Sequence, residues 1–327
     1  MQRIYFYITA LALALTACKK DSSSGNSLAA GNRLTYVIGD NGNLSLFTAA
    51  LSYTHLGDTL LKPGPYTVLV PNDNAFNASG YANVVAVEGT SSALMDQIIS
   101  YHILGGTYYL NELPFSFNQE ISTLHGDKMY VTHWVKAGDT ILTINGTPVI
   151  AYNLPASNGV IQVLSAVLNP PIYKNIHEAL SGDTALTFFN EAMNHTGLTD
   201  TIAEGSAVYT VFAPTNSAFR ALGFMSTDSI LATDPAILSA IIKYHVLSDR
   251  RFIYDYILST DASGVSGQTM IDGSSATVTL ISSGPGTYSG ITIQGAGNTS
   301  ASNLVRSNIL AGNGVVHTID QVLKQTF

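Results

Sequence analysis

The sequence predicts an α+β protein built from two tandem domains. Three boxes of residues occur in the same order in each half of the chain, which indicates an internal duplication. Within each half, segments with helical periodicity come first and segments with strand-like alternation follow. This segregation favours α+β over a doubly wound parallel sheet. A length of 327 residues is enough for two domains that each bury their own core.

The first two boxes repeat at the same distance along the chain. Tyr66–Phe76 matches Tyr209–Phe219 at an offset of 143 residues, and Tyr101–Leu104 matches Tyr244–Leu247 at that same offset. Solenoid and propeller repeats have periods of roughly 20 to 50 residues, far shorter than this one. The repeated unit is therefore a whole domain.

The third box shows where the two copies differ in length. Asn158–Leu164 matches Asn313–Ile319 at an offset of 155, so the second copy carries 12 additional residues ahead of this box. Asn169–Pro171 forms a stiff joint between the copies, because each proline restricts the residue before it. We expect domain 1 at residues 34–170 and domain 2 at residues 171–327.

Each domain is expected to begin with helices. Apolar residues recur with the spacing of one helical face in both copies. They are Leu44, Phe47, Leu51 and Leu56 in the first copy and Leu186, Phe189, Met193 and Leu198 in the second. A short apolar strand follows, then a proline with an Asn or Thr suited to cap the next helix, and then a further helix. The expected ranges are strands at 66–70 and 209–213 and helices at 93–102 and 235–245.

The rest of each copy alternates apolar and polar residues, as half-buried strands do. In the first copy Asn145-Gly146 supplies a hairpin turn. In the second copy Ser282–Gly286 separates two strands, and we expect it to hold much of the additional length. The expected strands are 129–135, 140–144 and 149–152 in domain 1 and 276–281 and 290–294 in domain 2.

The N-terminus predicts export. Met1–Arg3 carries a positive charge and Ile4–Ala14 forms an apolar run. This run is shorter than the roughly 20 residues that a membrane-spanning helix needs, but it matches the roughly 7 to 15 of a signal-peptide core. Residues 1–17 are therefore expected to be a signal peptide, in preference to an N-terminal core helix.

The end of this segment predicts a lipid anchor. Leu15–Cys18 resembles the bacterial lipobox, in which the cysteine is acylated and becomes the first residue of the mature chain. Cys18 is then the lipidation site, where acyl chains such as palmitate contribute about 0.8 kcal/mol per buried methylene to membrane binding. Residues 18–33, rich in Ser, Gly, Asn and Ala, comprise the acylated cysteine and a flexible tether.

The residues after the cysteine predict the compartment. The residue directly after Cys18 is Lys19 and not an aspartate, and Lys20 follows it. In this respect the sequence resembles lipoproteins that are sent to the outer membrane. Lys20-Asp21 is also similar to a surface-export signal, although Ser22 stands where a second acidic residue is usual. We expect a lipid-anchored outer-membrane protein at the cell surface, with the periplasmic face as the alternative.

The composition excludes several classes of partner and chemistry. The formal net charge is -8, and no cluster of Lys and Arg goes beyond single pairs, so no nucleic-acid partner is expected. Charged residues make up only 11% of the chain, which excludes an acidic disordered protein. Cys18 is the only cysteine, so the mature chain forms no internal disulfide and has no cysteine nucleophile.

The three boxes are closely similar to the conserved boxes of the fasciclin-type domain. They cover the chain from about Leu34 to Phe327. The resemblance implies a β-wedge or sandwich flanked by helices in each domain, in a family whose members mostly mediate cell adhesion and extracellular-matrix contacts. Domain 1 departs from the pattern. It has Leu69-Val70 where the second copy has Phe-Ala, and Gln162 where the second copy has His317.

The Tyr-His pair is the candidate binding determinant that the resemblance carries over. Its positions are Tyr101, His102, Tyr244 and His245. Each histidine follows an isoleucine by four residues, so it lies on the apolar face of its helix. The alternative to a binding role is therefore a buried, hydrogen-bonded histidine.

No catalytic or metal motif is found. His177-Glu178 lacks the second histidine of a zinc-protease helix, and Gly295-Ala296-Gly297 lacks the third glycine of a dinucleotide fingerprint. His317 and Asp320 stand three residues apart, so on a strand they point to opposite faces and form no direct dyad. We expect no enzyme activity, no metal and no cofactor.

The predicted function is that of a non-enzymatic, membrane-anchored adhesion or binding lipoprotein that contacts extracellular or envelope protein or polysaccharide. The alternative is an accessory carrier lipoprotein that binds a small apolar ligand, or a glycan for a neighbouring transporter. A third reading, a hydrolase with an unrecognised site, would need a polar pocket joining His317 to a carboxylate. For the Gly/Ser-rich segment between Asp261 and Asn303, an interaction loop and a tolerated insertion remain equal alternatives.

Overall fold

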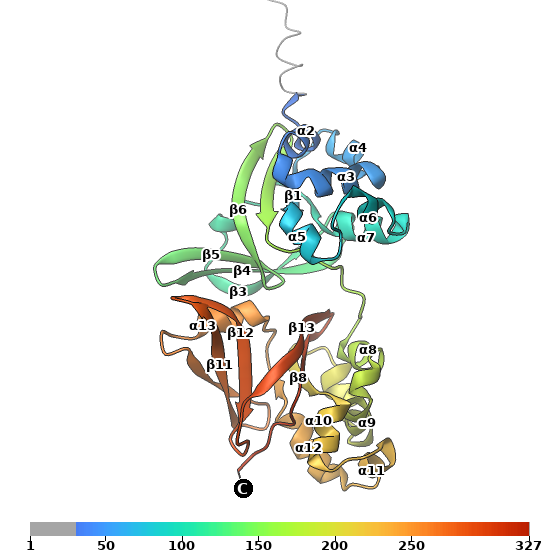
Figure 1. Cartoon of the computed structure of the whole chain (residues 1–327), viewed down its shortest axis with the longest axis vertical. Coiled ribbons are helices and arrows are strands. Elements are labelled where there is room, and N and C mark those ends of the chain that lie inside the picture. The colour runs from blue at the N-terminus through green and yellow to red at the C-terminus, as the bar shows by residue number, and fades with distance from the viewer. Residues whose placement is uncertain (1–30, 327) are drawn as a thin grey trace, which may run out of the picture.

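The computed structural model of the protein describes residues 31–326, which form two α+β domains placed end to end (Figure 1). The expected signal peptide at 1–17, Cys18 and most of the expected tether lie outside the described residues. Within residues 31–326, no helix is both long enough and apolar enough to cross a membrane. The α+β class and the tandem arrangement are confirmed.

Domain 1 consists of a seven-stranded sheet and a group of helices (Figure 1). The strand order is β2-β1-β7-β6-β5-β4-β3. The strands are β1 (Tyr66–Pro71), β2 (Ile103–Gly105), β3 (Ser116–Ser122), β4 (Lys128–Lys136), β5 (Asp139–Ile144), β6 (Thr147–Ala156) and β7 (Gly159–Leu164). The helices are α2 (Leu34–Gly39), α3 (Ser45–Tyr53), α4 (Leu56–Leu60), α5 (Asp73–Ala78), α6 (Val84–Glu88) and α7 (Ser92–Tyr101), with 3-10 turns η1 (Gly42–Leu44) and η2 (Leu110–Glu112).

Domain 2 repeats this topology. Its strand order, read as β9-β8-β14-β13-β12-β11-β10, follows the same path as that of domain 1. The strands are β8 (Tyr209–Pro214), β9 (Val246–Leu247), β10 (Val265–Thr269), β11 (Ser275–Gly284), β12 (Thr287–Gly295), β13 (Ser302–Ala311) and β14 (Gly314–Ile319). The helices are α8 (Ile176–Ser181), α9 (Thr187–His195), α10 (Asn216–Leu222), α11 (Thr227–Leu231), α12 (Pro235–Lys243) and α13 (Ile253–Ser259), with the 3-10 turn η3 (Thr184–Leu186) and the short π-helix η4 (Thr199–Ala203).

The first and third boxes of each domain form a parallel pair of central strands. Tyr66 is the register partner of Gly159, and Tyr209 is that of Gly314. A Cβ at either glycine would lie against the carbonyl oxygen of its partner tyrosine, closer than real Cβ atoms come. The Asn-Gly start of the third box therefore allows the two backbones to approach.

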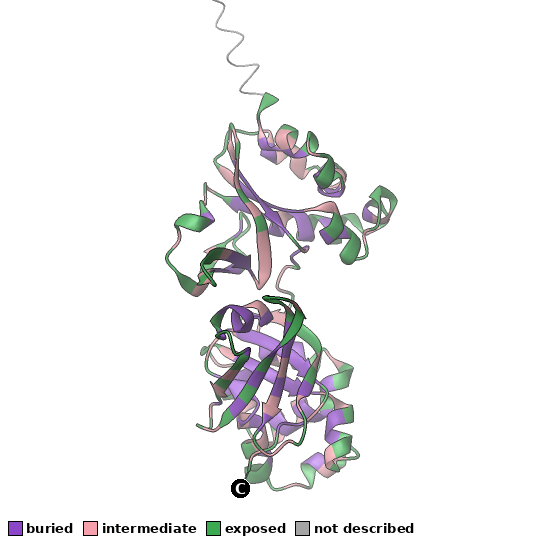
Figure 2. Ribbon diagram, turned by 60° about the vertical axis from the view of Figure 1, so that its left-hand side comes forward, coloured by how far each residue is buried: buried purple, intermediate pink, exposed green. Residues whose placement is uncertain are grey.

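Alternation along β1 divides the core of domain 1 into two parts. Val68 and Val70 pack with the helices, whereas Leu69 points to the other face and packs with apolar residues of β4 and β5. Domain 2 does the same, with Val211 on the helix side and Phe212 on the other. Figure 2 shows buried residues concentrated in the sheets and on the inward faces of the helices.

The predicted helix caps are confirmed. The side chain of Asn72 accepts a hydrogen bond from Ala75 N at 2.9 Å, and that of Thr215 accepts one from Ala218 N at 3.3 Å. Each cap satisfies a backbone N–H group that would otherwise lack a partner at the start of its helix.

Two expectations need correction. The apolar face at the start of domain 1 is not one helix, because His55, with φ of 59°, separates α3 from α4. The prediction that Ser282–Gly286 holds much of the additional length is wrong, because its Gly-Pro-Gly sequence closes the tight β11–β12 hairpin instead. The additional residues lie in α13, where domain 1 has only η2, and in the connection at 296–301.

Candidate functional site

The Tyr-His pair lies where the helix before β2, or before β9, ends. Tyr101 and Tyr244 are each 1% exposed, and His102 and His245 are fully buried. A partner at the surface therefore does not reach these imidazoles without a change in the fold. The positions on the apolar face explain this burial.

In domain 1 the histidine connects its helix to the segment after the last strand. Nδ1 of His102 lies 2.7 Å from Ile98 O, while Nε2 accepts a hydrogen bond from Leu168 N at 3.0 Å. Because Nε2 accepts, Nδ1 carries the proton and donates to the carbonyl, and the ring is neutral. Burial lowers the pKa of His102 to about 4, which keeps the ring neutral at physiological pH.

Domain 2 repeats this arrangement. His245 makes the same two contacts with Ile241 O at 2.7 Å and with Leu323 N at 2.9 Å, and burial lowers its pKa to about 4. The tyrosines also correspond. The hydroxyl of Tyr101 donates to Lys128 O and accepts from Asn145 Nδ2, each at 2.9 Å, and Tyr244 makes two such bonds at 2.7 and 2.9 Å.

The Tyr-His pair of domain 2 supports an apolar groove on the surface. The groove has a volume of about 540 Å³ and lies between α12 and the segment after β14. Ile237 is 56% exposed along it, and Lys324 is the one charged residue of its described lining. Its apolar wall consists of Leu222, Ile237, Ile241, Tyr244, Val322 and Leu323. A binding role for the pair stays a prediction, and this groove is the surface through which the pair would exert it.

The equivalent groove of domain 1 is bordered by residues of domain 2. It lies between α7 and the segment after β7, with a volume of about 560 Å³ and an exposed Leu94 in the place of Ile237. The linker residue Ile172 and the 307–310 segment of β13 form its remaining walls. Domain 2 itself therefore borders this groove, whereas among residues 31–326 no further domain borders the groove of domain 2.

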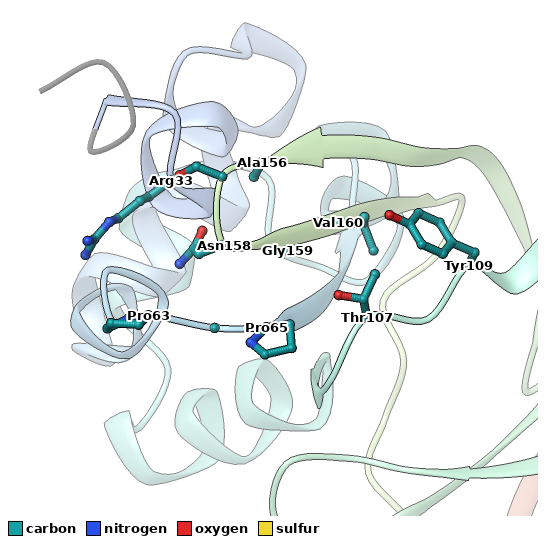
Figure 3. A pocket seen from close by; sticks show the side chains of 11 residues that line it. Arg33, Pro63, Pro65, Thr107, Tyr109, Ala156, Asn158, Gly159 and Val160 are labelled. Atoms are coloured by element: carbon teal, nitrogen blue, oxygen red, sulfur yellow. The ribbon is translucent and has the colours of Figure 1, made fainter. Parts of the chain in front are cut away.

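A second candidate surface is the polar pocket at the opposite pole of domain 1 (Figure 3). Its volume is about 710 Å³, and Figure 3 shows Arg33 on one side of it and Tyr109 on the other. Tyr109 is 44% exposed, and Pro63 and Pro65 form part of the rim. An exposed ring, a guanidinium group and backbone amides suit weak contacts with a polar partner.

The titratable residues that distinguish domain 2 serve structure. His317 is fully buried, accepts from Asn308 N at Nδ1 (3.1 Å) and donates from Nε2 to Arg251 O (2.9 Å). Gln162 stands at the same place in domain 1, where its side chain accepts from Asn153 N and donates to Tyr108 O. The amide and the neutral imidazole thus hold the same two backbone groups.

The other expected candidates are not brought together. Asp320 accepts hydrogen bonds from Ser302 Oγ and from Asn303, not from His317. His177 lies 4.0 Å from Glu204, and no group of three metal-ligating side chains occurs among residues 31–326. No arrangement of nucleophile and base emerges from the residues singled out in the sequence.

Sequence reasoning missed two sets of residues. The groove lining was missed because its members are single apolar residues on three separate segments. The contact residues between the domains were missed as well, although Arg250-Arg251 and Asp255 are unusual in a chain with only 11% charged residues. A charged residue within an apolar stretch, such as Asp255 in Phe252–Leu258, was the available signal.

Comparison with known proteins finds relatives that match part of this chain. Stabilin-2 of Mus musculus is 28% identical over 208 residues, which cover 60% of this chain and 8% of stabilin-2. Transforming growth factor-beta-induced protein ig-h3 of Sus scrofa is 28% identical over 180 residues, covering 55% of this chain and 25% of that protein. The chain thus spans a quarter or less of the length of these two relatives. Protein sll1483 of Synechocystis is 30% identical over 138 residues, covering 42% of this chain and 72% of that protein.

A solved structure of a FAS1 domain pair, from the insect cell adhesion molecule fasciclin I, is 19% identical and covers 89% of this chain, with a TM-score of 0.42. The fasciclin domain family matches residues 42–170 and 184–325, which include all three boxes in both copies. These matched residues contain the parallel central strands, the capped helices and the buried Tyr-His pairs described above. The chain belongs to the fasciclin domain family.

Proposed function

We propose that the protein is a membrane-anchored adhesion lipoprotein that binds extracellular protein or polysaccharide and performs no reaction on it. Family membership supports adhesion as the class of function. The single observation that carries the choice of site is the open apolar groove beside Tyr244. It lies at the end of the molecule opposite to α2, where the described chain begins (Figure 1).

The groove suits a partner that contributes apolar groups. An exposed isoleucine loses water when a partner covers it, and full burial of such a side chain contributes about 1.5–3 kcal/mol. Its walls are positioned by the buried hydrogen bonds of His245 and Tyr244, so the surface is largely formed before binding. Anchors of this kind in a preformed depression often dominate an interface.

A pair of matched substitutions tests this site. Ile237→Asp places a charge in the open groove, and we expect it to weaken binding at least about tenfold, since one buried side chain contributes about 1.5–3 kcal/mol. Leu94→Asp changes the equivalent position of domain 1 and should leave the affinity unchanged. The measurement is binding of residues 27–327 to arrays of matrix proteins and glycans. Equal losses in both variants would exclude this groove, and no binding by the wild type would contradict adhesion.

Anchoring through Cys18 is the second part of the proposal, and it rests on the lipobox. We expect radiolabelled palmitate to be incorporated into the wild type and not into Cys18→Ser. Protease treatment of intact cells should remove both domains if they face outward, while a periplasmic control protein stays intact. Protection in intact cells followed by cleavage after lysis would place the domains in the periplasm.

The alternative, a carrier of a small apolar ligand, is favoured by one property of the same groove. Its volume of about 540 Å³ lies within the range of roughly 300–1,000 Å³ typical of small-molecule sites. Native mass spectrometry of protein purified without detergent distinguishes the two functions. A co-purifying apolar ligand that is lost in Ile237→Asp would support the carrier, and an unliganded mass would count against it.

A further inference from the structure

A buried carboxylate of domain 2 is hydrogen-bonded by domain 1. Asp255, on α13, is fully buried, and its Oδ2 accepts a hydrogen bond from Phe252 N at 2.8 Å within its own domain. The other donors come from domain 1: Thr132 Oγ1 donates to Oδ1 and Asn118 Nδ2 donates to Oδ2, each at 2.9 Å. Oδ1 therefore has a donor only when the two domains are in contact, and Oδ2 gains its second donor from the same contact.

The donor Asn118 is aimed at domain 2 by an irregularity in its strand. The β3–β4 register shifts between Ser116 and Gln119, and Asn118 between them has φ of 52°. Such bulges redirect a side chain out of the regular pleat. The redirected amide also donates to Arg250 O at 2.6 Å, so a single side chain contacts both a backbone carbonyl and the buried carboxylate of domain 2.

A guanidinium group and an aromatic cluster complete this contact. The centre of the Arg250 guanidinium lies 3.8 Å from the ring of Tyr130, which belongs to β4 of domain 1. Arg250 also donates to three backbone carbonyls of domain 2, so it is held rigidly beneath that ring. One buried apolar cluster spans the two domains and contains Tyr130, Phe252 and Val315. Gly146 of domain 1 packs close to Phe252, since a Cβ added to this glycine would lie only 2.5 Å from Phe252 Cβ.

We infer that the β3–β4 face of domain 1 and the Arg250–Asp255 face of domain 2 form a lock that holds the two domains as one rigid body. Domains joined by a linker usually move relative to each other unless their interface is large and apolar. Here a buried carboxylate, and not a large apolar area, holds the interface. Removing Thr132 Oγ1 would leave Oδ1 of Asp255 buried without a donor, and removing the Asn118 amide would leave Oδ2 with only Phe252 N. Figure 1 shows β3, β4 and α13 on the same side of the molecule, at this joint.

The lock is specific to this pair of faces. In domain 1 the position of Arg250 is taken by Thr107, and that of Asp255 by Glu112, at the offset of 143 found for the second box. Glu112 is exposed and Thr107 makes none of the contacts of Arg250. The equivalent face of domain 1 therefore lacks both the buried acceptor and the stacked cation, and the contact forms in one order only.

The test compares the orientation of the two domains in the mature full-length chain with Cys18→Ser. Residual dipolar couplings of the wild type should fit a single alignment tensor for both domains. In the double variant Asn118→Ala, Thr132→Val we expect the docking equilibrium to fall by about a hundredfold, because a buried carboxylate loses two donors. Two tensors and a larger radius of gyration in X-ray scattering would then appear.

Two controls keep the test decisive. Thr107→Ala with Glu112→Gln, at the equivalent positions of domain 1, should leave the single tensor intact. Trp134, the only tryptophan, stacks on Phe117, which in turn contacts Arg251, so its emission should shift when the joint opens. Separate tensors in the wild type would overturn the proposal, as would an unchanged tensor in a folded double variant. If the double variant does not fold, the wild-type couplings decide alone.

Discussion

At the scale of single residues, the buried histidines are polar connectors that carry no charge. His102, His245 and His317 each donate one hydrogen bond and accept one, and burial lowers the pKa of each to about 4. A residue type often associated with catalysis or binding is used here for its two differently oriented ring nitrogens. Gln162 supports this interpretation, because its side-chain amide takes the position of His317 in domain 1 and likewise accepts one hydrogen bond from the backbone and donates one to it.

The depressed pKa values predict that acid destabilises the protein. Between pH 6.5 and 4 the unfolded chain binds protons at these histidines that the folded chain does not bind. Their stabilising contribution is therefore complete above pH 6.5 and is lost progressively as the pH falls from 6.5 to 4. We expect the free energy of unfolding, measured by urea denaturation, to be lower at pH 4.5 than at pH 7 by several kcal/mol.

A single substitution isolates this effect from other groups, including Asp255, whose pKa is raised by burial and which acts in the opposite direction. His317→Gln copies the natural residue of domain 1 and should fold normally while losing part of the pH dependence. A variant with the same pH dependence as the wild type would show that His317 does not contribute to it.

At the scale of elements, the helices and strands predicted from the sequence agree best with the structure where the local apolar periodicity is strongest. β4 was predicted at 129–135 and spans Lys128–Lys136, because its alternation is regular and a turn follows it. The short strands β2 and β9 were missed, since two or three residues show no periodicity. α13 was missed because its packing against domain 1 depends on contacts that are distant in sequence.

The same limit applies to the candidate site. The Tyr-His pairs were found from the repeat, and their burial followed from the four-residue spacing to an isoleucine. The groove above the second pair needs α12 and the segment after β14 to meet, and only the fold brings Ile237 beside Leu323. Local patterns therefore located the residues that support the surface, but not the surface itself.

The parallel central strands predict a strict need for glycine. Gly314→Ala would push a Cβ against the carbonyl of Tyr209 and against Ile176, so the strands must separate. We expect a loss of at least about 1–3 kcal/mol in stability, measured by denaturant titration. Gly42→Ala is a suitable control, because no atom lies within 4 Å of the added Cβ. Equal stability of the two variants would contradict the close approach of the strands.

At the scale of the whole molecule, the two copies of one fold have unequal surfaces. In domain 1 the groove lies beside domain 2 and the polar pocket at the far pole is open. In domain 2 the corresponding polar pocket is bordered by domain 1, and the groove is open. A duplicated chain thus presents one copy of each surface, at opposite ends. Binding measured for the pair should therefore not be twice that of a single domain.

Arg250 contacts both domains, so its removal should lower the stability of both. Arg250→Ala leaves the carbonyls of Ala311, Gly312 and Gly314 without their donor and removes the stack on Tyr130. We expect a loss of about 3 kcal/mol or more, at about 1 kcal/mol or more for each lost bond to a charged group. Hydrogen exchange should rise in β14 and also in β4. Faster exchange confined to β14 would show that the contact does not reach domain 1.

The position of the linker gives the joint a mechanical direction. The chain passes between the domains on the side of the helices, whereas the contacts of Asp255 and Arg250 lie on the side of α13 and β3 (Figure 1). Tension along the long axis is carried by the covalent chain on one side and by noncovalent contacts on the other. The joint would therefore open as a hinge about the Pro170-Pro171 segment, breaking its contacts one after another at low force rather than all together.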